Sequence, residues 1–301
     1  FDAANVALKD VLPRNIKLVK GSVVGADENK KGVTFEGTLF GAAPPIVNVA
    51  VDPLASPFGY VPLAGFGPIV VSTSDESITN FNVPSFVYAG EVYSQIGIVS
   101  NGYIVVGGGT GADVNYVNSD LPDAAIPNNV LAPFWTDLNP EFGGRVLIAT
   151  LTDGTNSWIV VEWESVSNYG DGETNTFQVW ISYTVADDIS FVYGADISDG
   201  DSGYLTVGAE NKYGNTGGTV YYDGVGVPPS PSFPIGSYEV DVYSTPGAAG
   251  ETHVITFSAQ GYQKGNWTNC AEMTSDLYQG TNIACFDGTV TKGKKPRNRR
   301  R

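Results

Sequence analysis

The stretch RVLIATLTDGTNSWIVVEWESVSNYGDGETNTFQVWISY, residues 145–183, decides the fold class of this chain. Three apolar runs, RVLIATL, SWIVVEW and TFQVWISY, are separated by TDGTN and YGDGETN, which are rich in the Asp, Asn and Gly that tight turns favour. The runs are short and rich in Val, Ile, Phe and Trp, which suit a pleated strand better than a helix. The stretch therefore predicts consecutive antiparallel strands joined by short turns.

The same succession of short apolar runs and turn clusters extends over most of the chain. Further runs of this kind are NVALKDV, KLVKGSVV, GVTFEGTL, IVNVAV, IGIVSNGYIVV, ISFVYGA, YLTVGAE, TVYYDG, YEVDVYS and HVITFSA. Helical periodicity is almost absent, and Gly (37 residues) and Pro (18) are abundant, as in chains of many short strands. The sequence therefore predicts an all-β protein, and its 301 residues suggest two domains.

Charge is distributed unevenly along the chain. Residues 292–301 (KGKKPRNRRR) hold seven of the 16 basic residues, whereas residues 32–291 hold 28 acidic residues against three basic ones. Because such an acidic surface repels phosphates, we expect no nucleic-acid partner. We expect the basic end to be a disordered, solvated tail; a nucleic-acid arm and a membrane-surface patch are the alternatives.

The two ends of the chain carry no targeting or membrane signal. No apolar run approaches the roughly 18 residues of a membrane helix. The opening FDAANVALKD is not a signal sequence, and we expect the chain to be a piece of a longer protein without a membrane span.

Two cysteines, Cys270 and Cys285, lie near the C-terminal end with turn-forming residues between them. In a secreted protein they would close a disulfide loop that contributes about 3 kcal/mol to the free energy of unfolding in the chain-entropy model. The alternative is a pair of free thiols. Zinc is not expected, because the single histidine, His253, is not spaced to join the cysteines.

The N-terminal segment NVALKDVLPRNIKLVKGSVVG, followed by KKGVTFEGTLF, resembles an immunoglobulin-like repeat of bacterial surface proteins. The residues that carry this resemblance are Asp10, Leu12, Pro13, Val19, Gly21, Ser22, Val33, Phe35 and Leu39. Pro13 has no amide hydrogen to donate to a ladder, so it should stand where a strand becomes a loop. The resemblance covers about residues 1–52, lacks the first strands of the module and implies a spacer or anchor.

Residues from about 80 to 260 carry a more specific resemblance. IGIVSNGYIVVGGG, LAPFWTDLNPEFGGRVLIAT, NTFQVWISY and VGAENKYGNTGGTVYYDG follow, in this order, the motif series of the nidogen-like domains of extracellular proteins. A bacterial form of this domain stands C-terminal to the catalytic domain of secreted subtilisin-like serine peptidases, and similar modules occur in adhesins. The resemblance implies a β-sandwich in an extracellular protein.

Together these features predict three segments in linear order. Residues 1–72 would form a partial immunoglobulin-like sandwich with a Pro- and Gly-rich linker, and residues 73–262 a larger antiparallel nidogen-like β-sandwich. Residues 263–301 would form a loop-rich, disulfide-containing tail with the basic end. The linker is placed in DPLASPFGYVPLAGFGPIVVSTSDES, because this stretch is rich in Pro, Gly and Ser and has no clear alternation.

The sequence offers little material for catalysis. A subtilisin-type triad needs an Asp, a His and a nucleophilic Ser, but the one histidine, His253, lies in an expected strand and no Gly-rich nucleophile segment is present. A glycosidase needs two facing carboxylates, for which Glu162 and Glu164 are candidates. The alternation of VVEWESV instead predicts that both point to solvent while Trp163 enters the core. We therefore expect no catalytic residue in this chain.

Calcium is the one ligand that the composition favours, because carboxylates and carbonyls in Gly-rich loops supply the oxygen atoms that it needs. The candidate ligands are Asp137, Asn139, Asp171, Asp196, Asp199 and Asp201, with Glu173 beside them. The alternative is that these are solvated turn residues. In LAPFWTDLNP (131–140), this alternative makes Leu131, Phe134 and Trp135 strand and core residues and leaves Asp137 and Asn139 to fold the turn.

The leading hypothesis is a non-catalytic, secreted accessory region of a subtilisin-like serine peptidase, which positions or stabilises the catalytic domain or recruits its substrate. Its partners would be that catalytic domain and a fibrous protein or polysaccharide substrate, and calcium is the only cofactor considered. The alternative is an adhesin or matrix-binding module whose exposed Tyr and Trp contact a polysaccharide or fibrous protein. An enzyme with an unfamiliar carboxylate site ranks third.

Overall fold

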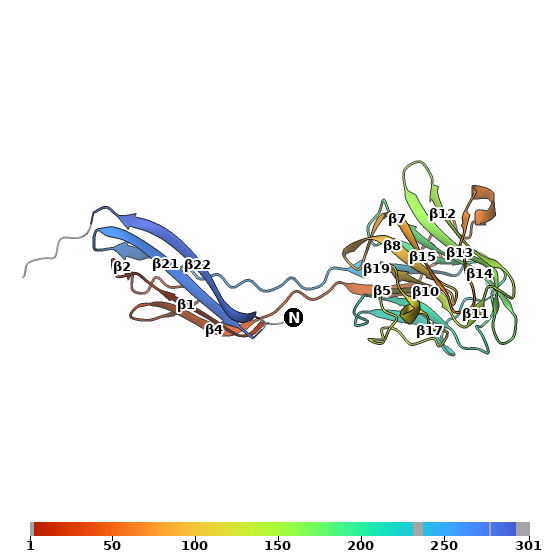
Figure 1. Cartoon of the computed structure of the whole chain (residues 1–301), viewed down its shortest axis with the longest axis horizontal. Coiled ribbons are helices and arrows are strands. Elements are labelled where there is room, and N and C mark those ends of the chain that lie inside the picture. The colour runs from red at the N-terminus through yellow and green to blue at the C-terminus, as the bar shows by residue number, and fades with distance from the viewer. Residues whose placement is uncertain (1–2, 231–236, 277, 293–301) are drawn as a thin grey trace, which may run out of the picture. The chain divides into compact units, whose positions relative to one another are not determined.

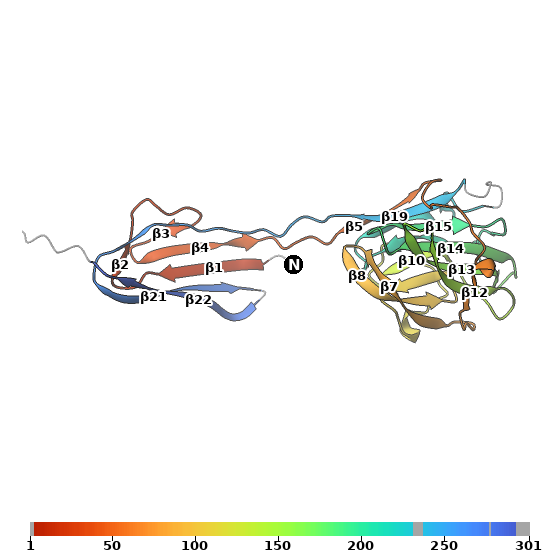
Figure 2. The same ribbon diagram turned by 90° about the horizontal axis from the view of Figure 1, so that it is seen from above.

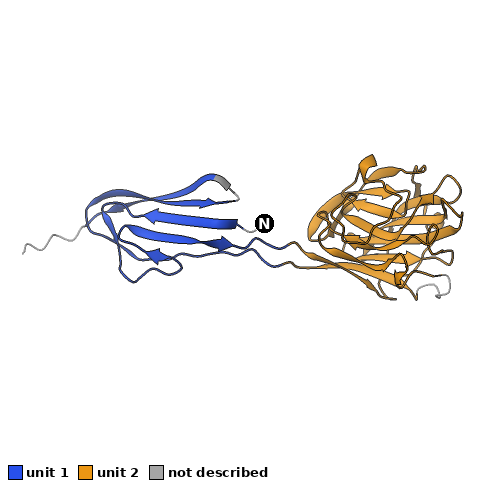
Figure 3. Cartoon of the chain, turned by 90° about the horizontal axis from the view of Figure 1, so that it is seen from below, with its two compact units in different colours: residues 1–43, 248–301 blue, residues 44–247 orange. Residues whose placement is uncertain are grey.

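Strands from the two ends of the chain pair with each other in the computed structural model, which describes residues 3–230, 237–276 and 278–292 (Figure 1). The chain divides into two compact units: residues 1–43 and 248–301 form unit 1, and residues 44–247 form unit 2 (Figure 3). The middle of the chain is thus inserted into the domain that its two ends build. This division differs from the predicted linear order, because strands far apart in sequence pair without any local signal.

Unit 1 consists of a five-stranded antiparallel sheet in the order β22-β21-β1-β4-β3 and a two-stranded sheet of β2 and β20. Its strands are β1 (Ala3–Val11), β2 (Ile16–Leu18), β3 (Asp27–Glu28), β4 (Gly32–Leu39), β20 (Ala259–Gly261), β21 (Gly265–Ser275) and β22 (Tyr278–Val290). The N-terminal β1 pairs with the C-terminal β21, for example through Asp10 and Ala271 (Figure 1). Pro13 lies two residues after the end of β1, where the strand becomes a loop, as predicted.

The predicted loop-rich tail is a β-hairpin over most of its length. Cys270 of β21 lies opposite Cys285 of β22, and the two form the predicted disulfide. The prediction of loops was wrong because unit 1 buries little: within the described residues its buried hydrophobic side chains are those of Val6, Val33 and Val290. Strands without a buried face show no apolar rhythm. The basic stretch 293–301 lies outside the described residues.

The scarcity of buried side chains predicts that unit 1 depends on its disulfide. Cys270→Ser with Cys285→Ser should lower the free energy of unfolding of unit 1 by about 3 kcal/mol, because the unfolded chain regains the entropy of the open loop. Scanning calorimetry should show the transition of unit 1 at lower temperature, with the transition of unit 2 as the internal control. An unchanged first transition would contradict this dependence.

Unit 2 is an antiparallel β-sandwich, whose two layers Figure 2 shows. One sheet has the order β18-β17-β16-β10-β9-β8-β7, and the other the order β5-β19-β15-β14-β13-β12-β6 with β11 paired to β13. The first sheet contains β7 (Ile78–Tyr88), β8 (Glu91–Val99), β9 (Tyr103–Val106), β10 (Val130–Trp135), β16 (Thr206–Glu210), β17 (Gly217–Tyr222) and β18 (Val225–Gly226). The second contains β5 (Ile46–Val51), β6 (Ile69–Val70), β11 (Leu138–Asn139), β12 (Arg145–Thr152), β13 (Ser157–Asn168), β14 (Thr174–Ser182), β15 (Ile189–Tyr193) and β19 (Glu239–Thr245).

In the part of the chain that the structure describes, helix is limited to two short 3₁₀ turns, η1 (Leu63–Phe66) and η2 (Gly111–Asp113). The all-β prediction is therefore confirmed. Among the described residues, no helix is long and apolar enough to cross a membrane.

The core between the two sheets is built around aromatic rings. Phe134 of β10 stacks on Phe177 of β14 with ring centroids 5.2 Å apart, and Phe177 stacks on Trp163 of β13 at 5.0 Å. The indole N–H of Trp163 donates to the carbonyl of Val99 in the opposite sheet at 3.3 Å. Leu131, Phe134 and Trp135 are all buried, as predicted.

Loops also cover parts of the outer faces of both sheets, which explains why so many runs are apolar throughout rather than alternating. Leu63 from the predicted linker packs on Trp158 and Trp180 at the outer face of β13 and β14. On the other sheet, Leu121 packs with Trp135, whose indole N–H donates to the Asn115 carbonyl at 2.9 Å. Residues 52–76 are therefore part of unit 2 rather than a linker.

Glu162 lies beneath this outer covering, which corrects the prediction that it points to solvent. Its side chain is fully buried and accepts hydrogen bonds from the Tyr60 hydroxyl (2.7 Å), the Leu63 amide (3.0 Å) and Gln178 Nε2 (3.2 Å). Burial raises the pKa of Glu162. Trp163 enters the core as predicted, while Glu164 pairs with Arg145. Alternation failed here because both faces of β13 are covered.

Replacing Glu162 tests whether this carboxylate holds the covering segment. Glu162→Ala should lower the free energy of unfolding by about 3 kcal/mol, because it leaves buried donors of Tyr60 and Leu63 without an acceptor. Glu162→Gln keeps one acceptor and should cost less. Urea denaturation measures both, and equal stability of Glu162→Ala and the wild type would show that the segment does not depend on Glu162.

Candidate binding site

Asn101, in the turn between β8 and β9, joins two loops at one end of the sandwich of unit 2. Its fully buried side chain donates from Nδ2 to both carboxylate oxygens of Glu76 at 3.2 Å, and its Oδ1 accepts from the Leu138 amide at 3.1 Å. Gly102 follows with φ +79°, and a Cβ there would lie 2.0 Å from the Phe134 carbonyl oxygen, so only glycine fits. These contacts hold the loop around residue 76 against the loop after β10.

Three carboxylates converge beside Asn101. One oxygen atom each of Asp75, Glu76 and Asp137 lies within 4.8 Å of the others. Oδ1 of Asp75 and Oδ1 of Asp137 are buried without a hydrogen-bond donor. Burial, together with repulsion from the carboxylates of Glu76, Asp201 and Asp75, raises the pKa of Asp137 to about 6. Such a cluster can share a proton or hold a hard cation that prefers oxygen ligands.

In the loop 136–141, the polar residues of LAPFWTDLNP have different hydrogen-bonding roles. Asn139 is buried and its Oδ1 accepts from the Glu141 amide at 2.8 Å, so it folds the turn as predicted. Thr136 instead joins this loop to the turn at 201–204, because its hydroxyl donates to the Tyr204 carbonyl (2.6 Å) and accepts from the Asp201 amide (2.8 Å). Asp137 was predicted to fold the turn by capping a backbone group, but its Oδ1 atom accepts no hydrogen bond, so this prediction was wrong.

The other predicted calcium ligands lie outside the carboxylate cluster. Asp171 accepts from Asn168 Nδ2 (3.0 Å) and the Glu173 amide (2.9 Å), and Asp196 accepts from the Thr174 hydroxyl at 2.8 Å. Asp196 and Asp199 line a separate pocket together with Glu173. Among the described residues these acids form no group of three with converging oxygen atoms. The hydrogen bonds of Asp171 and Asp196 are those of ordinary loop-stabilising residues.

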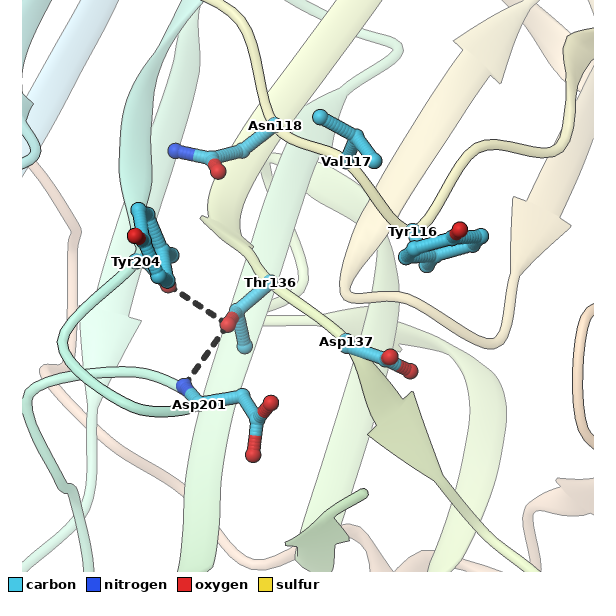
Figure 4. A pocket seen from close by; sticks show the side chains of 7 residues that line it. All are labelled: Tyr116, Val117, Asn118, Thr136, Asp137, Asp201 and Tyr204. Carbon is cyan, nitrogen blue, oxygen red and sulfur yellow. Dashed lines mark hydrogen bonds between the residues drawn. The ribbon is translucent and has the colours of Figure 1, made fainter. Parts of the chain in front are cut away.

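Asp137 and Asp201 line a pocket of about 280 Å³, together with Tyr116, Val117, Asn118, Thr136 and Tyr204 (Figure 4). Tyr116 and Tyr204 stand on opposite sides of it, and more than half of each side chain is exposed (Figure 4). Asn118 is held by hydrogen bonds from its Nδ2 to Thr206 (3.1 Å) and Asp223 (2.8 Å). Two aromatic faces and two carboxylates, without a basic side chain in the lining, suit a cationic group.

Asp201 belongs to both the pocket and the loop framework. Its Oδ1 accepts from the Gly170 amide at 2.6 Å, and its side chain raises the pKa of Asp137 by repulsion. A cation in the pocket would relieve this repulsion.

His253 belongs to unit 1, whereas the residues of the cluster and the pocket belong to unit 2. It is exposed, its ring stacks on Phe35 with centroids 4.0 Å apart, and a ring nitrogen contacts the Gly25 carbonyl. The expected strand HVITFSA is limited to an isolated bridge between Thr256 and Val24 and to the start of β20 at Ala259.

Sequence reasoning missed Asp75, Glu76, Tyr116, Asn118 and Tyr204. Asp75 and Glu76 stand at the end of the segment that was predicted to be a linker. The only sequence feature that could have marked them as site residues is that two acidic residues stand just before a strand. Tyr116 and Asn118 lie in a long loop without regular pattern, and nothing local relates them to Tyr204.

The motif-bearing loops that meet here are those of a known family. A family model described as NIDO related matches residues 55–259, about two-thirds of the chain. The chain belongs to the NIDO-related family. This membership confirms the predicted nidogen-like domain, and the matched NIDO-related region contains every residue of the carboxylate cluster and the pocket. Neither the curated proteins nor the solved structures give a significant match.

The raised pKa of Asp137 predicts a pH-dependent stability that calcium should modify. The folded-state pKa of about 6 exceeds the ordinary value of 3.8, so the folded state binds more protons between these values. In chelator, the melting temperature should therefore fall as pH rises from about 4 to about 6. At pH 7 calcium should raise the melting temperature, because it replaces the lost proton as the counter-charge.

Asp137→Asn should remove both effects. Glu141→Gln, which alters an exposed carboxylate of the same loop, serves as the control and should leave both in place. Differential scanning fluorimetry with calcium and with chelator measures them, and identical melting temperatures in the two conditions would dismiss a calcium site at this cluster.

Proposed function

We propose that this chain is a non-catalytic extracellular accessory region of a secreted subtilisin-like serine peptidase, in which the NIDO-related sandwich recruits a protein substrate. The observation that carries the recruiting role is the pocket of unit 2, where Tyr116 and Tyr204 flank the carboxylates of Asp137 and Asp201. The link to a peptidase rests on the resemblance of the motif series to such accessory domains. The disulfide Cys270–Cys285 supports an oxidising, extracytoplasmic setting.

The pocket's chemistry favours a lysine or arginine side chain as its ligand. A cation that enters between the tyrosines gains from the electron-rich ring faces and from charge-assisted hydrogen bonds to the carboxylates. A volume of about 280 Å³ lies just below the usual range of small-molecule pockets, which suits one side chain rather than a sugar chain. A basic segment of a fibrous protein would meet these requirements.

Unit 2 has no spare positive charge of its own to occupy the pocket. Residues 44–247 contain 23 acidic residues and two basic ones, Arg145 and Lys212. Arg145 pairs with Glu164 and Lys212 with Glu91. The net field of unit 2 therefore attracts cationic partners, and the pocket offers them a site where the negative charge is already concentrated.

The carboxylate cluster would fix the position of the loops that line the pocket. A proton or calcium ion shared by Asp75, Glu76 and Asp137 would hold the loop that carries Thr136 and, through its hydrogen bonds, the Asp201–Tyr204 turn. Calcium is thus proposed as a structural ion. Unit 1 would act as the spacer that the N-terminal resemblance implies, with β20, β21 and β22 supplying strands that the N-terminal segment lacks.

An adhesin is the second candidate, and one observation favours it. Phe142 and Tyr169 stack with centroids 5.8 Å apart and are both at least half exposed, on loops joined to the pocket through the backbone bond of Tyr169 to Asp137. Exposed aromatic pairs provide contact area for a polymer surface. The residues encoded upstream of Phe1 separate the candidates, since a catalytic domain there supports the peptidase.

Binding to an insoluble fibrous protein tests the recruiting role directly. The fraction of chain retained on insoluble collagen should fall about tenfold in Tyr116→Ala with Tyr204→Ala, because the pocket loses both ring faces. Tyr213→Ala, an equally exposed tyrosine of unit 2 outside the pocket, is the matched control and should bind normally. Polylysine should compete and polyglutamate should not.

Two results would count against substrate recruitment through a basic side chain. One is retention on collagen that the two tyrosine substitutions leave unchanged. The other is pocket-dependent retention on chitin or cellulose without retention on collagen, which would assign the pocket to a polysaccharide.

A further inference from the structure

Unit 1 carries a groove of about 630 Å³ whose lining is mainly basic, whereas unit 2 is strongly acidic. It is lined by residues 11–14, 16–18 and 20, by residues 28–31 at the turn between β3 and β4, and by Tyr262 after β20. Its five basic side chains are those of Arg14, Lys17, Lys20, Lys30 and Lys31, and its one carboxylate is that of Glu28. We propose that this basic groove binds an acidic polysaccharide.

No described residue forms an ion pair with the basic side chains of the groove. The ion pairs found in residues 3–230, 237–276 and 278–292 involve Arg145 and Lys212, both in unit 2. The carboxylate of Glu28 accepts from the Gly21 amide at 2.7 Å. Five exposed cations around one carboxylate create a potential that attracts a ligand with several negative charges.

The backbone around the basic side chains is held in place before any ligand binds. Oδ1 of Asn29 accepts from the amides of Lys31 and Gly32, each at 2.9 Å, and the Lys31 carbonyl accepts from the Leu12 amide at 2.9 Å. On the other side, β2 pairs with β20, so that Lys17 lies opposite Gln260. The two basic clusters, residues 14–20 with Arg14, Lys17 and Lys20 and residues 30–31 with Lys30 and Lys31, therefore stand on a fixed framework, which lowers the entropy cost of binding.

The aromatic content of the groove argues against nucleic acid. Tyr262 is the one aromatic residue in the lining, and the Lys17 ammonium lies 4.5 Å from the centre of its ring. Its amide donates to the Asn15 carbonyl at 3.0 Å and its hydroxyl to the Arg14 carbonyl. The ring is therefore committed to the framework and offers no platform for stacking bases, on which single-stranded nucleic acids depend.

The setting of unit 1 favours a polysaccharide among the remaining polyanions. The Cys270–Cys285 disulfide of the same unit indicates an oxidising compartment outside the cytosol. The five cations come from two segments of the chain, residues 14–20 and residues 30–31, and a ligand with several negative charges can pair with more of them than a single phosphate can. A chain with repeated carboxylates or sulfates would contact both basic clusters at once. This site is independent of the pocket in unit 2.

Affinity for defined polyanions tests the groove in the full chain. Isothermal calorimetry at about 50 mM salt, where surface electrostatics are strong, should show binding to heparin as the sulfated probe and to alginate as the carboxylated probe. Lys17→Gln with Lys30→Gln and Lys31→Gln should lower the affinity for both about tenfold and flatten its dependence on salt, because fewer counter-ions are displaced.

The matched control removes the same number of exposed charges elsewhere in unit 1. Lys9→Gln with Lys264→Gln and Lys292→Gln should change the affinity by less than about threefold, since these side chains do not line the groove. Circular dichroism and melting temperatures show whether each variant is folded. A further variant with glutamine at the six basic positions between 294 and 301 separates the groove from the basic end, and should retain binding.

Four outcomes would overturn the proposal. These are absence of binding to both polysaccharides, equal losses in the groove variant and the control, loss of binding in the 294–301 variant alone, and duplex DNA bound as tightly as heparin at equal salt. None of them bears on collagen retention through Tyr116 and Tyr204, so failure of the groove and failure of the pocket are distinguishable.

Discussion

The pairing of β5 with β19 is the constraint on which the two-unit organisation depends. These strands run antiparallel in register from Val51 opposite Val240 to Ile46 opposite Thr245. The chain therefore enters and leaves the sandwich at one place, and the amide of Ala43 then donates to the carbonyl of Ala248 within unit 1. Because entry and exit coincide, the two ends of the chain can build one sheet while about 200 residues fold between them.

Three carboxylates of unit 2 that are buried or partly buried differ in how their oxygen atoms are bonded. Glu162 has three donors and holds the segment that covers β13 and β14, which is a structural role. Glu210 has its Oε2 bound by the Asp123 amide but its Oε1 buried without a partner, and burial raises its pKa to about 8. Asp137 is left with an unpaired oxygen beside two other carboxylates. Because Oε1 of Glu210 and Oδ1 of Asp137 have no donor, each can take up a proton or a cation without breaking a hydrogen bond, whereas both oxygens of Glu162 already have donors.

The sequence allowed the fold class, the NIDO-related region and the disulfide to be predicted, because each has a local or ordered signal. The succession of runs and turns around Trp163 and Phe177 indicates strands regardless of how they are arranged. The hairpin of β21 and β22 gave no such signal, since no residue of β21 is buried and the strand therefore needs no apolar face. Glu162 was misassigned for the opposite reason: its strand is buried on both faces, so alternation carries no information.

By itself the sequence determined an all-β chain with a nidogen-like region and pointed to the loop that contains Asp137, because backbone preference and motif order are properties of neighbouring residues. Only the tertiary structure decided that Asp137 meets Asp75 and Glu76, that Tyr116 faces Tyr204, and that Lys17 and Lys31 line one groove with Tyr262. The physical reason is that these groups are brought together by pairing between distant strands and by side-chain hydrogen bonds. Asn101, for example, bonds to Glu76 and Leu138, which lie 25 and 37 residues away from it in the sequence. The charge and burial of a site depend on which distant residues lie next to each other, and no single stretch of sequence specifies this.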